Sequence, residues 1–193
     1  MLIRLVTKLK DTMRVRQESL LLLAGIAATT NAAQVFEQDR AAPSIEACPT
    51  TGTPYEDFII DTPLPGWQGT PEEWPCQYAG VLDSSTTGTD KLFFWYYRPS
   101  DVTDDTPVAI WMNGGPGASS AFANFLLNGP MRITRDGDDI STGYKIKLAK
   151  DGSWLDAPAH MVYLDQPIGT GFSWGDPLLT TMEEAGDQFI YWL

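Results

Sequence analysis

The sequence is short of histidine, cysteine and basic side chains, and each shortage excludes a class of function. Among its 193 residues there is one histidine, His160, and there are two cysteines, Cys48 and Cys76. Nothing near them supplies the further ligands of a zinc site, so we expect no bound metal. The 13 basic residues are outnumbered by 25 acidic ones, and the formal net charge of −12 repels nucleic acid and anionic membranes. We therefore expect neither as a partner.

What is present is typical of a globular protein. Hydrophobic residues make up 43% of the chain and charged residues 20%, which is enough for one domain with a core. The two cysteines can pair with each other in an oxidising compartment. Free thiols, or partners outside this sequence, remain the alternatives.

The first 33 residues predict a secretory signal peptide. Basic residues precede an apolar run, Leu20–Ala28, and the small residues Thr30–Ala33 follow. This is the order of charged, apolar and cleavage regions in a signal, and the run is too short to cross a bilayer. An amphipathic or irregular N-terminus is the alternative.

Apolar patterning predicts an α/β fold with a mixed sheet. Two runs around a polar turn at Ser84–Asp90 indicate a hairpin, and two continuously apolar runs indicate buried strands. The four predicted strands are Tyr78–Leu82, Leu92–Tyr97, Pro107–Met112 and Met161–Asp165. We expect an irregular segment at 34–75 and a polar excursion at 131–158.

Two helices are predicted. One spans Ala118–Leu127, with Phe122, Phe125 and Leu126 on its apolar face. The other begins at a capping box in which Thr180 or Thr181 faces Glu183 or Glu184. Its apolar face is predicted to comprise Met182, Ala185, Phe189, Ile190 and Leu193. Because this helix is still amphipathic at Leu193, and buried strands need neighbours on both sides, we expect the chain to be the front part of a longer domain.

The segment Asn113–Gly117 (NGGPG) connects a buried strand directly to a helix. Glycines let the backbone turn sharply and let a substrate approach, and backbone N–H groups at such a turn can stabilise a developing negative charge. In α/β-hydrolases, one oxyanion-hole donor comes from the loop between strand and helix at this place. A tight structural turn is the alternative.

Two long motifs resemble those of the serine carboxypeptidases, peptidase family S10. Ile110–Ser120 (IWMNGGPGASS) is similar to the family's WLNGGPGCSS, and Leu164–Trp174 (LDQPIGTGFSW) is also family-like. Shorter matches surround them, and the resemblance covers residues 58–193. It implies an α/β-hydrolase fold, of which residues 34–193 are the N-terminal part.

The resemblance implies a serine-type carboxypeptidase that releases C-terminal residues of peptides through an acyl-enzyme, without a cofactor. It implies that Gly115 donates its N–H to the oxyanion, that Gly114 shapes the turn, and that Asn113 binds the substrate's terminal carboxylate. The family's catalytic serine, aspartate and histidine would lie beyond this chain, so no catalytic residue is assigned within it. The expected destination is the secretory pathway, with the product secreted or delivered to a vacuole or lysosome.

Two departures from the family pattern leave other functions open. Ala118 stands where the family has a disulfide-bonded cysteine, and Leu127 stands where it has a glutamate that helps bind the terminal carboxylate. The alternatives are a serine-carboxypeptidase-like acyltransferase and a non-catalytic secreted binding protein on the same scaffold.

Several residues with catalytic chemistry are better explained as structural. Gly171–Gly175 (GFSWG) fits G-x-S-x-G, but it lies in a loop and lacks the flanking strand and helix of a nucleophile elbow. We therefore interpret Ser173 as a loop residue and Ser119 and Ser120 as helix-start residues. His160 and Asp165 are likewise expected to be structural.

Overall fold

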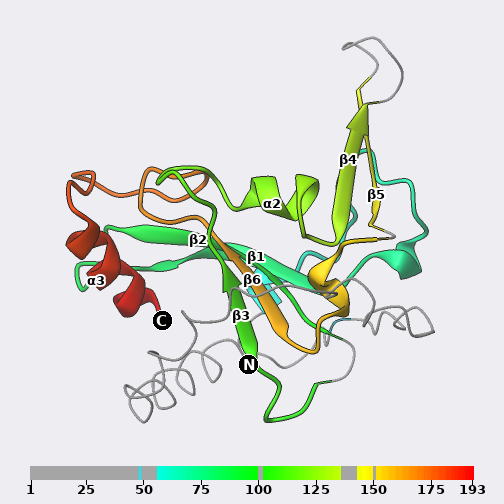
Figure 1. Cartoon of the computed structure of the whole chain (residues 1–193), viewed down its shortest axis with the longest axis horizontal. Coiled ribbons are helices and arrows are strands. Elements are labelled where there is room, and N and C mark those ends of the chain that lie inside the picture. The colour runs from blue at the N-terminus through cyan, green and yellow to red at the C-terminus, as the bar shows by residue number, and fades with distance from the viewer. Residues whose placement is uncertain (1–47, 49–55, 100–101, 136–142, 150) are drawn as a thin grey trace, which may run out of the picture. The chain divides into compact units, whose positions relative to one another are not determined.

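A four-stranded mixed sheet forms the centre of the computed structural model, which describes Cys48 and residues 56–99, 102–135, 143–149 and 151–193 (Figure 1). The strand order is β1-β2-β6-β3. The pairs β1–β2 and β2–β6 are antiparallel, whereas β3 runs parallel to β6. The bounds are β1 Gln77–Asp83, β2 Lys91–Tyr97, β3 Val108–Trp111 and β6 His160–Leu164. The predicted strands are thus confirmed, and the predicted signal peptide lies outside the described residues.

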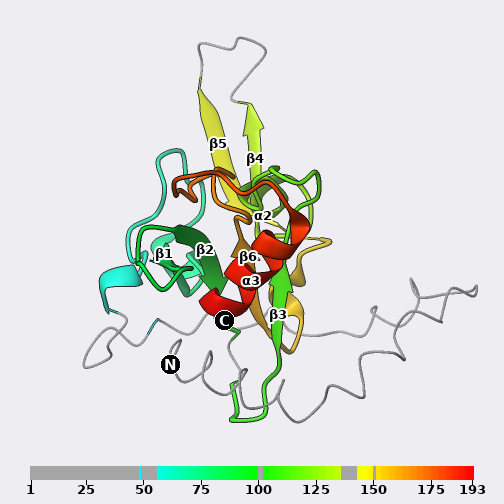
Figure 2. The ribbon, with the colours of Figure 1, turned by 90° about the vertical axis from the view of Figure 1, so that its left-hand side faces the viewer.

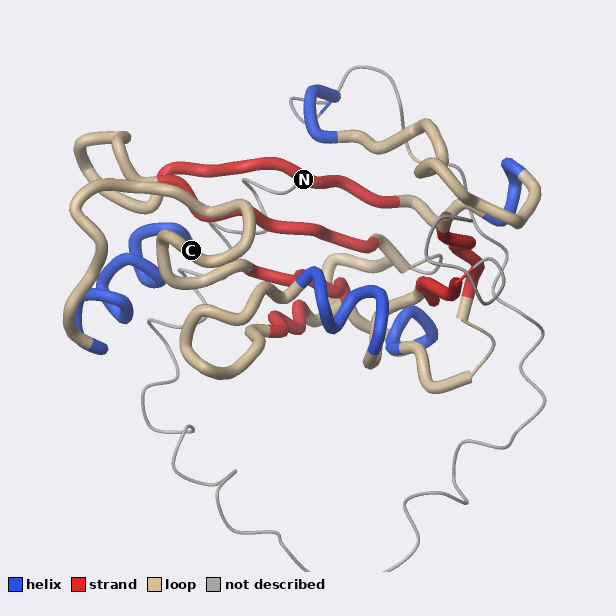
Figure 3. Tube along the Cα trace, turned by 90° about the horizontal axis from the view of Figure 1, so that it is seen from above, coloured by secondary structure: helices blue, strands red, loops and turns tan. Residues whose placement is uncertain are grey.

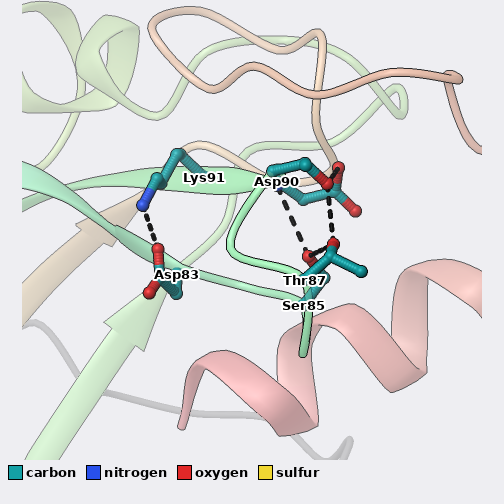
Figure 4. Close-up of polar contacts among 6 residues, drawn as sticks. Asp83, Ser85, Thr87, Asp90 and Lys91 are labelled. Carbon is teal, nitrogen blue, oxygen red and sulfur yellow. Dashed lines mark hydrogen bonds and ion pairs between the residues drawn. The ribbon is translucent and has the colours of Figure 1, made fainter.

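The β1–β2 hairpin closes through the predicted polar turn, where Gly88 has φ 69°. Lys91 pairs with Asp83 across the two strand ends. Within the turn, the hydroxyls of Ser85 and Thr87 lie 3.0 Å apart, and Ser85 Oγ accepts a hydrogen bond from a backbone N–H of the same turn (Figure 4). These contacts fix the register that continues along the whole hairpin to the pair Gln77↔Tyr97.

The two parallel strands differ in burial. All five residues of β6 are buried between β2 and β3. The prediction that Pro107–Met112 is fully buried was wrong, because every residue of β3 is half-buried. Within the described part of the chain β3 pairs with β6 alone and forms an edge of the sheet.

Side chains alternate along the strands and so form two cores. On one face, Trp95, Tyr97, Met161 and Tyr163 pack with Ala123 of the helix α2. The opposite face carries Phe94, whose ring contacts those of Phe58 and Trp192. Since Trp192 belongs to the helix α3, the two helices cover opposite faces of the sheet. Figure 3 shows α2 lying beside β6.

The helix α2, Ala121–Leu126, is shorter than predicted, and its predicted apolar face is only partly right. Phe125 packs against the core, with its ring centroid 5.6 Å from that of Trp95. Ala123 and Asn124 are buried, whereas Phe122 and Leu126 are 52% and 48% exposed. Tyr97 Oη donates a 2.9 Å hydrogen bond to Asn124 Oδ1, and this polar contact turns the Asn124 side of the helix toward the sheet.

The helix α3, Met182–Trp192, begins with the predicted capping box. Glu184 Oε2 accepts from the Thr181 N–H at 3.0 Å, and the Glu184 N–H donates to Thr181 Oγ1 at 3.2 Å. The predicted apolar face is only partly right. Ala185 is buried, but Met182 and Ile190 are exposed, and the buried residues also include Gln188 and Trp192.

The prediction of a polar excursion at 131–158 missed a second sheet. Met131–Arg135 (β4) and Tyr144–Leu148 (β5) form an antiparallel pair that extends away from the main sheet (Figures 1 and 2). One side of the pair is anchored to the core by Met131 and Ile146, which are both buried. Among the described residues, short 3-10 helices complete the regular structure, at Glu56–Phe58 (η2), Pro71–Glu73 (η3) and Trp154–Asp156 (η5).

Cys48 and Cys76 form a disulfide, which is one of the alternatives left open by the sequence. Cys76 immediately precedes β1 and is buried. The bond therefore ties Cys48 to the residue that directly precedes the main sheet.

Candidate functional site

The NGGPG turn lies between β3 and α2 and presents bare backbone to solvent. Gly114, Gly115, Pro116 and Gly117 are all exposed. Gly115 has φ 141°, in the region that favours glycine, and a Cβ there would lie 3.3 Å from the Gly117 nitrogen. A Cβ on Gly114 or Gly117 would meet nothing within 4 Å. The turn therefore leaves open space around its peptide groups.

Ser120 connects the start of the turn to the main sheet. Its Oγ accepts a 3.0 Å hydrogen bond from the backbone N–H of Asn113 and donates one of 2.6 Å to the carbonyl of Leu164, the last residue of β6. Ser120 is 1% exposed. The side-chain amide of Asn113 also donates to the Ser119 carbonyl at 3.3 Å. Asn113 is thus held at both its backbone and its side chain.

Asp165 is a buried carboxylate that joins the turn to the loop after β6. Its Oδ1 accepts from the Ser120 N–H at 2.6 Å and from Ser119 Oγ at 2.9 Å. Its Oδ2 accepts from the Phe172 N–H at 3.0 Å and from the same Ser119 hydroxyl at 3.1 Å. The side chain is 1% exposed. Asp165 was expected to be a structural residue at a strand end. In the structure it binds Ser119, Ser120 and the Phe172 N–H.

Ser173 is a structural member of the same loop. It is 4% exposed, its Oγ donates to the Asp165 carbonyl at 2.6 Å, and it accepts from the Phe93 N–H at 2.8 Å. A nucleophile must be accessible to substrate and have a base within hydrogen-bond reach. These contacts agree with the prediction that the G-x-S-x-G match is no nucleophile elbow.

The single histidine lies away from the turn. His160 begins β6, whereas Asp165 follows the end of that strand. His160 is 2% exposed, and its Nδ1 lies 2.7 Å from the hydroxyl of Tyr96 on the sheet face opposite α2. Burial, together with the positive charge of Arg98, lowers the pKa of His160 below its usual 6.5. This buried position agrees with the expectation that His160 is a structural residue.

The surface next to the turn is neutral and apolar. Between Pro107 and Met131 the sequence holds no ionisable side chain. Phe122, Leu126 and Leu127 are each about half exposed on or directly after α2. A ligand at the turn therefore meets apolar side chains and neutral hydrogen-bonding groups in this segment.

The site contains no candidate metal centre. Across residues 56–99, 102–135, 143–149 and 151–193, together with Cys48, no three His, Cys, Asp or Glu side chains are grouped so that they could hold a metal ion. In the same part of the chain, no helix has the length and hydropathy needed to cross a membrane.

A mixed sheet in strand order β1-β2-β6-β3, with an exposed glycine turn between β3 and α2, agrees with part of an α/β-hydrolase fold. Sequence and structure comparisons identify the family within that class. The family profile described as serine carboxypeptidase matches residues 65–190, and the chain belongs to this family.

Relatives and a solved structure agree with this assignment. The chain is 32% identical over 151 residues to the pheromone-processing carboxypeptidase KEX1 of Candida glabrata, covering 74% of this chain and 20% of that protein. It is 33% identical to serine carboxypeptidase S10 family member 2 of Dictyostelium discoideum, covering 71% and 24% respectively. The crystal structure of Kex1(delta)p from Saccharomyces cerevisiae superposes with a TM-score of 0.52 at 26% identity, over 72% of this chain and 30% of that one. The chain thus spans about a fifth to a quarter of the length of these curated relatives.

The network around the turn was not predicted from the sequence. Ser119 and Ser120 were interpreted as helix-start residues, and their contacts with a residue about 45 positions later were not foreseen. The available signal was a carboxylate directly after the apolar run of Met161–Leu164, followed by a glycine-rich loop. A buried acid in such a place needs hydrogen-bond donors from elsewhere in the chain.

Proposed function

We propose that the full protein is a serine-type carboxypeptidase, which hydrolyses C-terminal residues of peptides through an acyl-enzyme. The observation that carries the proposal is the open NGGPG turn, held at the carboxyl end of the parallel strands β3 and β6. The family assignment supports the same reaction class.

In this proposal the chain supplies one side of the oxyanion hole. The Gly115 N–H donates to the oxyanion of the tetrahedral intermediate, Gly114 shapes the turn, and Asn113 binds the terminal carboxylate of the substrate. One such donor contributes about 10²–10³ in kcat. The exposed, left-handed backbone of Gly115 supports this role, because a side chain there would crowd the neighbouring peptide groups.

The catalytic serine, aspartate and histidine are proposed to lie outside these 193 residues. The engaged and buried state of Ser173, and the distance along β6 between His160 and the turn, support this assignment. The 193-residue chain alone is therefore expected to release no amino acid from a peptide. Turnover by this chain that a serine-directed phosphonate abolishes would contradict the assignment.

The test of the function itself uses the full-length protein. Wild type is expected to release C-terminal amino acids and to be labelled by a phosphonate inhibitor. Gly115→Ala keeps the N–H but is expected to lose about 10²–10³ in kcat, because a side chain is strained at φ 141° and shifts this donor away from the oxyanion. Gly186→Ala is the matched control, because a Cβ on this α3 glycine meets nothing within 4 Å. Phosphonate labelling with transfer of the acyl group to an alcohol, and little hydrolysis, would favour an acyltransferase instead. Absence of labelling would favour a non-catalytic binding protein.

Leu127 gives the proposal a specificity test. It is 48% exposed where the family has a glutamate that helps bind the terminal carboxylate. Leu127→Glu is expected to raise kcat/KM for a free peptide carboxylate about tenfold over its C-terminal amide at acidic pH, because it adds a charge-assisted hydrogen bond. The comparison of acid and amide substrates in both proteins measures this, and an unchanged ratio would contradict it.

We further propose that residues 1–33 are a cleaved signal peptide and that the protein enters the secretory pathway, to be secreted or delivered to a vacuole or lysosome. The Cys48–Cys76 disulfide supports an oxidising compartment. N-terminal sequencing of the mature protein is expected to begin at about residue 34.

A further inference from the structure

The turn has almost no packing of its own, so its position depends on its two ends. A side-chain atom placed on Gly114 or Gly117 would meet open space. At one end, Asn113 is bonded to Ser120 through its backbone and to Ser119 through its side chain. At the other end the chain passes through these same two serines into α2. Whatever holds Ser119 and Ser120 therefore holds the whole turn.

Both serines are held by Asp165. The carboxylate accepts from the Ser120 N–H at 2.6 Å and from the Ser119 hydroxyl at 2.9 and 3.1 Å. The Ser119 hydroxyl in turn accepts from the Ala121 N–H at 3.2 Å. A third donor, the Phe172 N–H at 3.0 Å, joins the loop after β6 to the same carboxylate. A buried carboxylate with several donors of fixed geometry has few alternative arrangements.

The loop after β6 leaves little space around the Asp165 carboxylate. Gly171 has φ 54°, and a Cβ at this glycine would overlap Asp165 Oδ2 and lie 2.7 Å from Ser119 Oγ. The loop therefore presses bare backbone against the carboxylate. The carboxylate cannot turn toward the loop without leaving the donors of the turn.

We propose that Asp165 is a positioning residue for the oxyanion turn: by holding Ser119, Ser120 and the Phe172 N–H, it fixes where the Gly115 N–H points. The proposal rests on the function proposed above. Asp165 does not touch substrate and transfers no proton. Its action is to keep the donor of Gly115 in place while the oxyanion forms.

The test measures both the turn and the reaction in the full-length protein. Asp165→Asn keeps the size of the side chain but replaces one acceptor oxygen by an NH2 group. Each carboxylate oxygen accepts hydrogen bonds, so the NH2 group would face a donor and at least one of these bonds would be lost. We expect amide hydrogen exchange at Asn113, Ser120 and Ala121, whose N–H groups are hydrogen-bonded in this network, to become at least about tenfold faster, while amides of β2 keep their rates. We expect kcat to fall about 100-fold with KM changed less than about threefold, because misplacement of a catalytic donor costs on this order.

Two further variants complete the design. Asp187→Asn removes an exposed carboxylate from α3 and is expected to change neither exchange nor kcat. Ser119→Ala removes one donor from Asp165 but leaves the Ser120 N–H, so its effects should have the same direction and be smaller. Should Asp165→Asn fail to fold, Ser119→Ala carries the same comparison.

The outcomes separate this proposal from the function on which it rests. Unchanged exchange at Asn113, Ser120 and Ala121 in the variants overturns the positioning role, whether or not the protein is active. Faster exchange with unchanged kcat in an active enzyme also overturns the positioning role, because catalysis would then not depend on how firmly Asp165 holds the turn. A wild-type protein without hydrolase activity, but with faster exchange in the variants, would refute the proposed function and leave the anchoring by Asp165 intact.

Discussion

Replacement of Tyr97 by phenylalanine is expected to destabilise the protein through a single buried hydrogen bond. The Tyr97 hydroxyl donates to Asn124 Oδ1 at 2.9 Å, and the two residues are 1% and 0% exposed. Burial holds the pKa of Tyr97 well above its usual 10, so the hydroxyl keeps the proton that it donates. Phenylalanine keeps the ring and leaves the Asn124 oxygen buried without a partner. The expected cost is about 1–3 kcal/mol.

The control for this prediction is the neighbouring Tyr163→Phe. The Tyr163 hydroxyl is buried but has no hydrogen-bond partner among the residues that the structure describes. Its removal leaves no buried group unpaired, so the free energy of unfolding should change by no more than about 0.5 kcal/mol. The two tyrosine rings are in edge contact, so both variants alter the same core.

Urea unfolding followed by circular dichroism measures both variants. With a slope of about 2 kcal/mol per molar urea, Tyr97→Phe should lower the midpoint by about 0.5–1.5 M while the slope stays constant. Equal midpoints for the two variants would refute the reasoning, because the cost would then come from the ring environment and not from the bond to α2.

Three further perturbations have expected outcomes. Gly171→Ala should cost about 3 kcal/mol or more in thermal unfolding, because the new Cβ overlaps Asp165 and φ is positive; a neutral result would mean that the loop is not pressed against the carboxylate. The lowered pKa of buried His160 makes the unfolded state bind more protons, so stability should fall as pH drops through about 6.5, and His160→Gln should flatten that slope in unfolding curves between pH 5 and 7. Cys48→Ser opens a disulfide loop with a sequence separation of 28 and should lower stability by about 3–4 kcal/mol; a loss below about 1 kcal/mol in chemical unfolding would contradict this.

The sequence predicted those elements whose formation depends on residues close together in the chain. The aromatic run of β2, the apolar run of β6 and the Thr181–Glu184 capping box all require only neighbours in sequence or a buried environment. The hairpin β4–β5 was missed because its strands, MRITR and YKIKL, are short and each carries two basic residues, so the segment was interpreted as polar. The alternation of apolar and polar residues in both strands was the available signal, and the burial of Met131 and Ile146 against the core agrees with it.

The sequence predicted where the exposed turn lies but not which contacts hold it. The glycines of the turn indicated where backbone would be exposed, and the structure places them there. The orientation of α2 depends on the bond from Tyr97 to Asn124, which lies 27 residues away, so periodicity alone placed only Phe125 of the predicted face correctly. The contacts of Asp165 with Ser119 and Ser120 cross an even longer stretch of chain. Hydrogen bonds between distant segments leave no periodic trace in the sequence.

The bonds that Asp165 makes across the chain also have a consequence for protein engineering. A designer who moved residues 113–117 alone into another scaffold would transfer the glycines but not what holds them. The unit that would have to be transplanted also includes Ser119, Ser120, Asp165 and the bare backbone of Gly171. The motif that is easiest to recognise is thus not a portable part, and its smallest transferable form is made of two segments of chain.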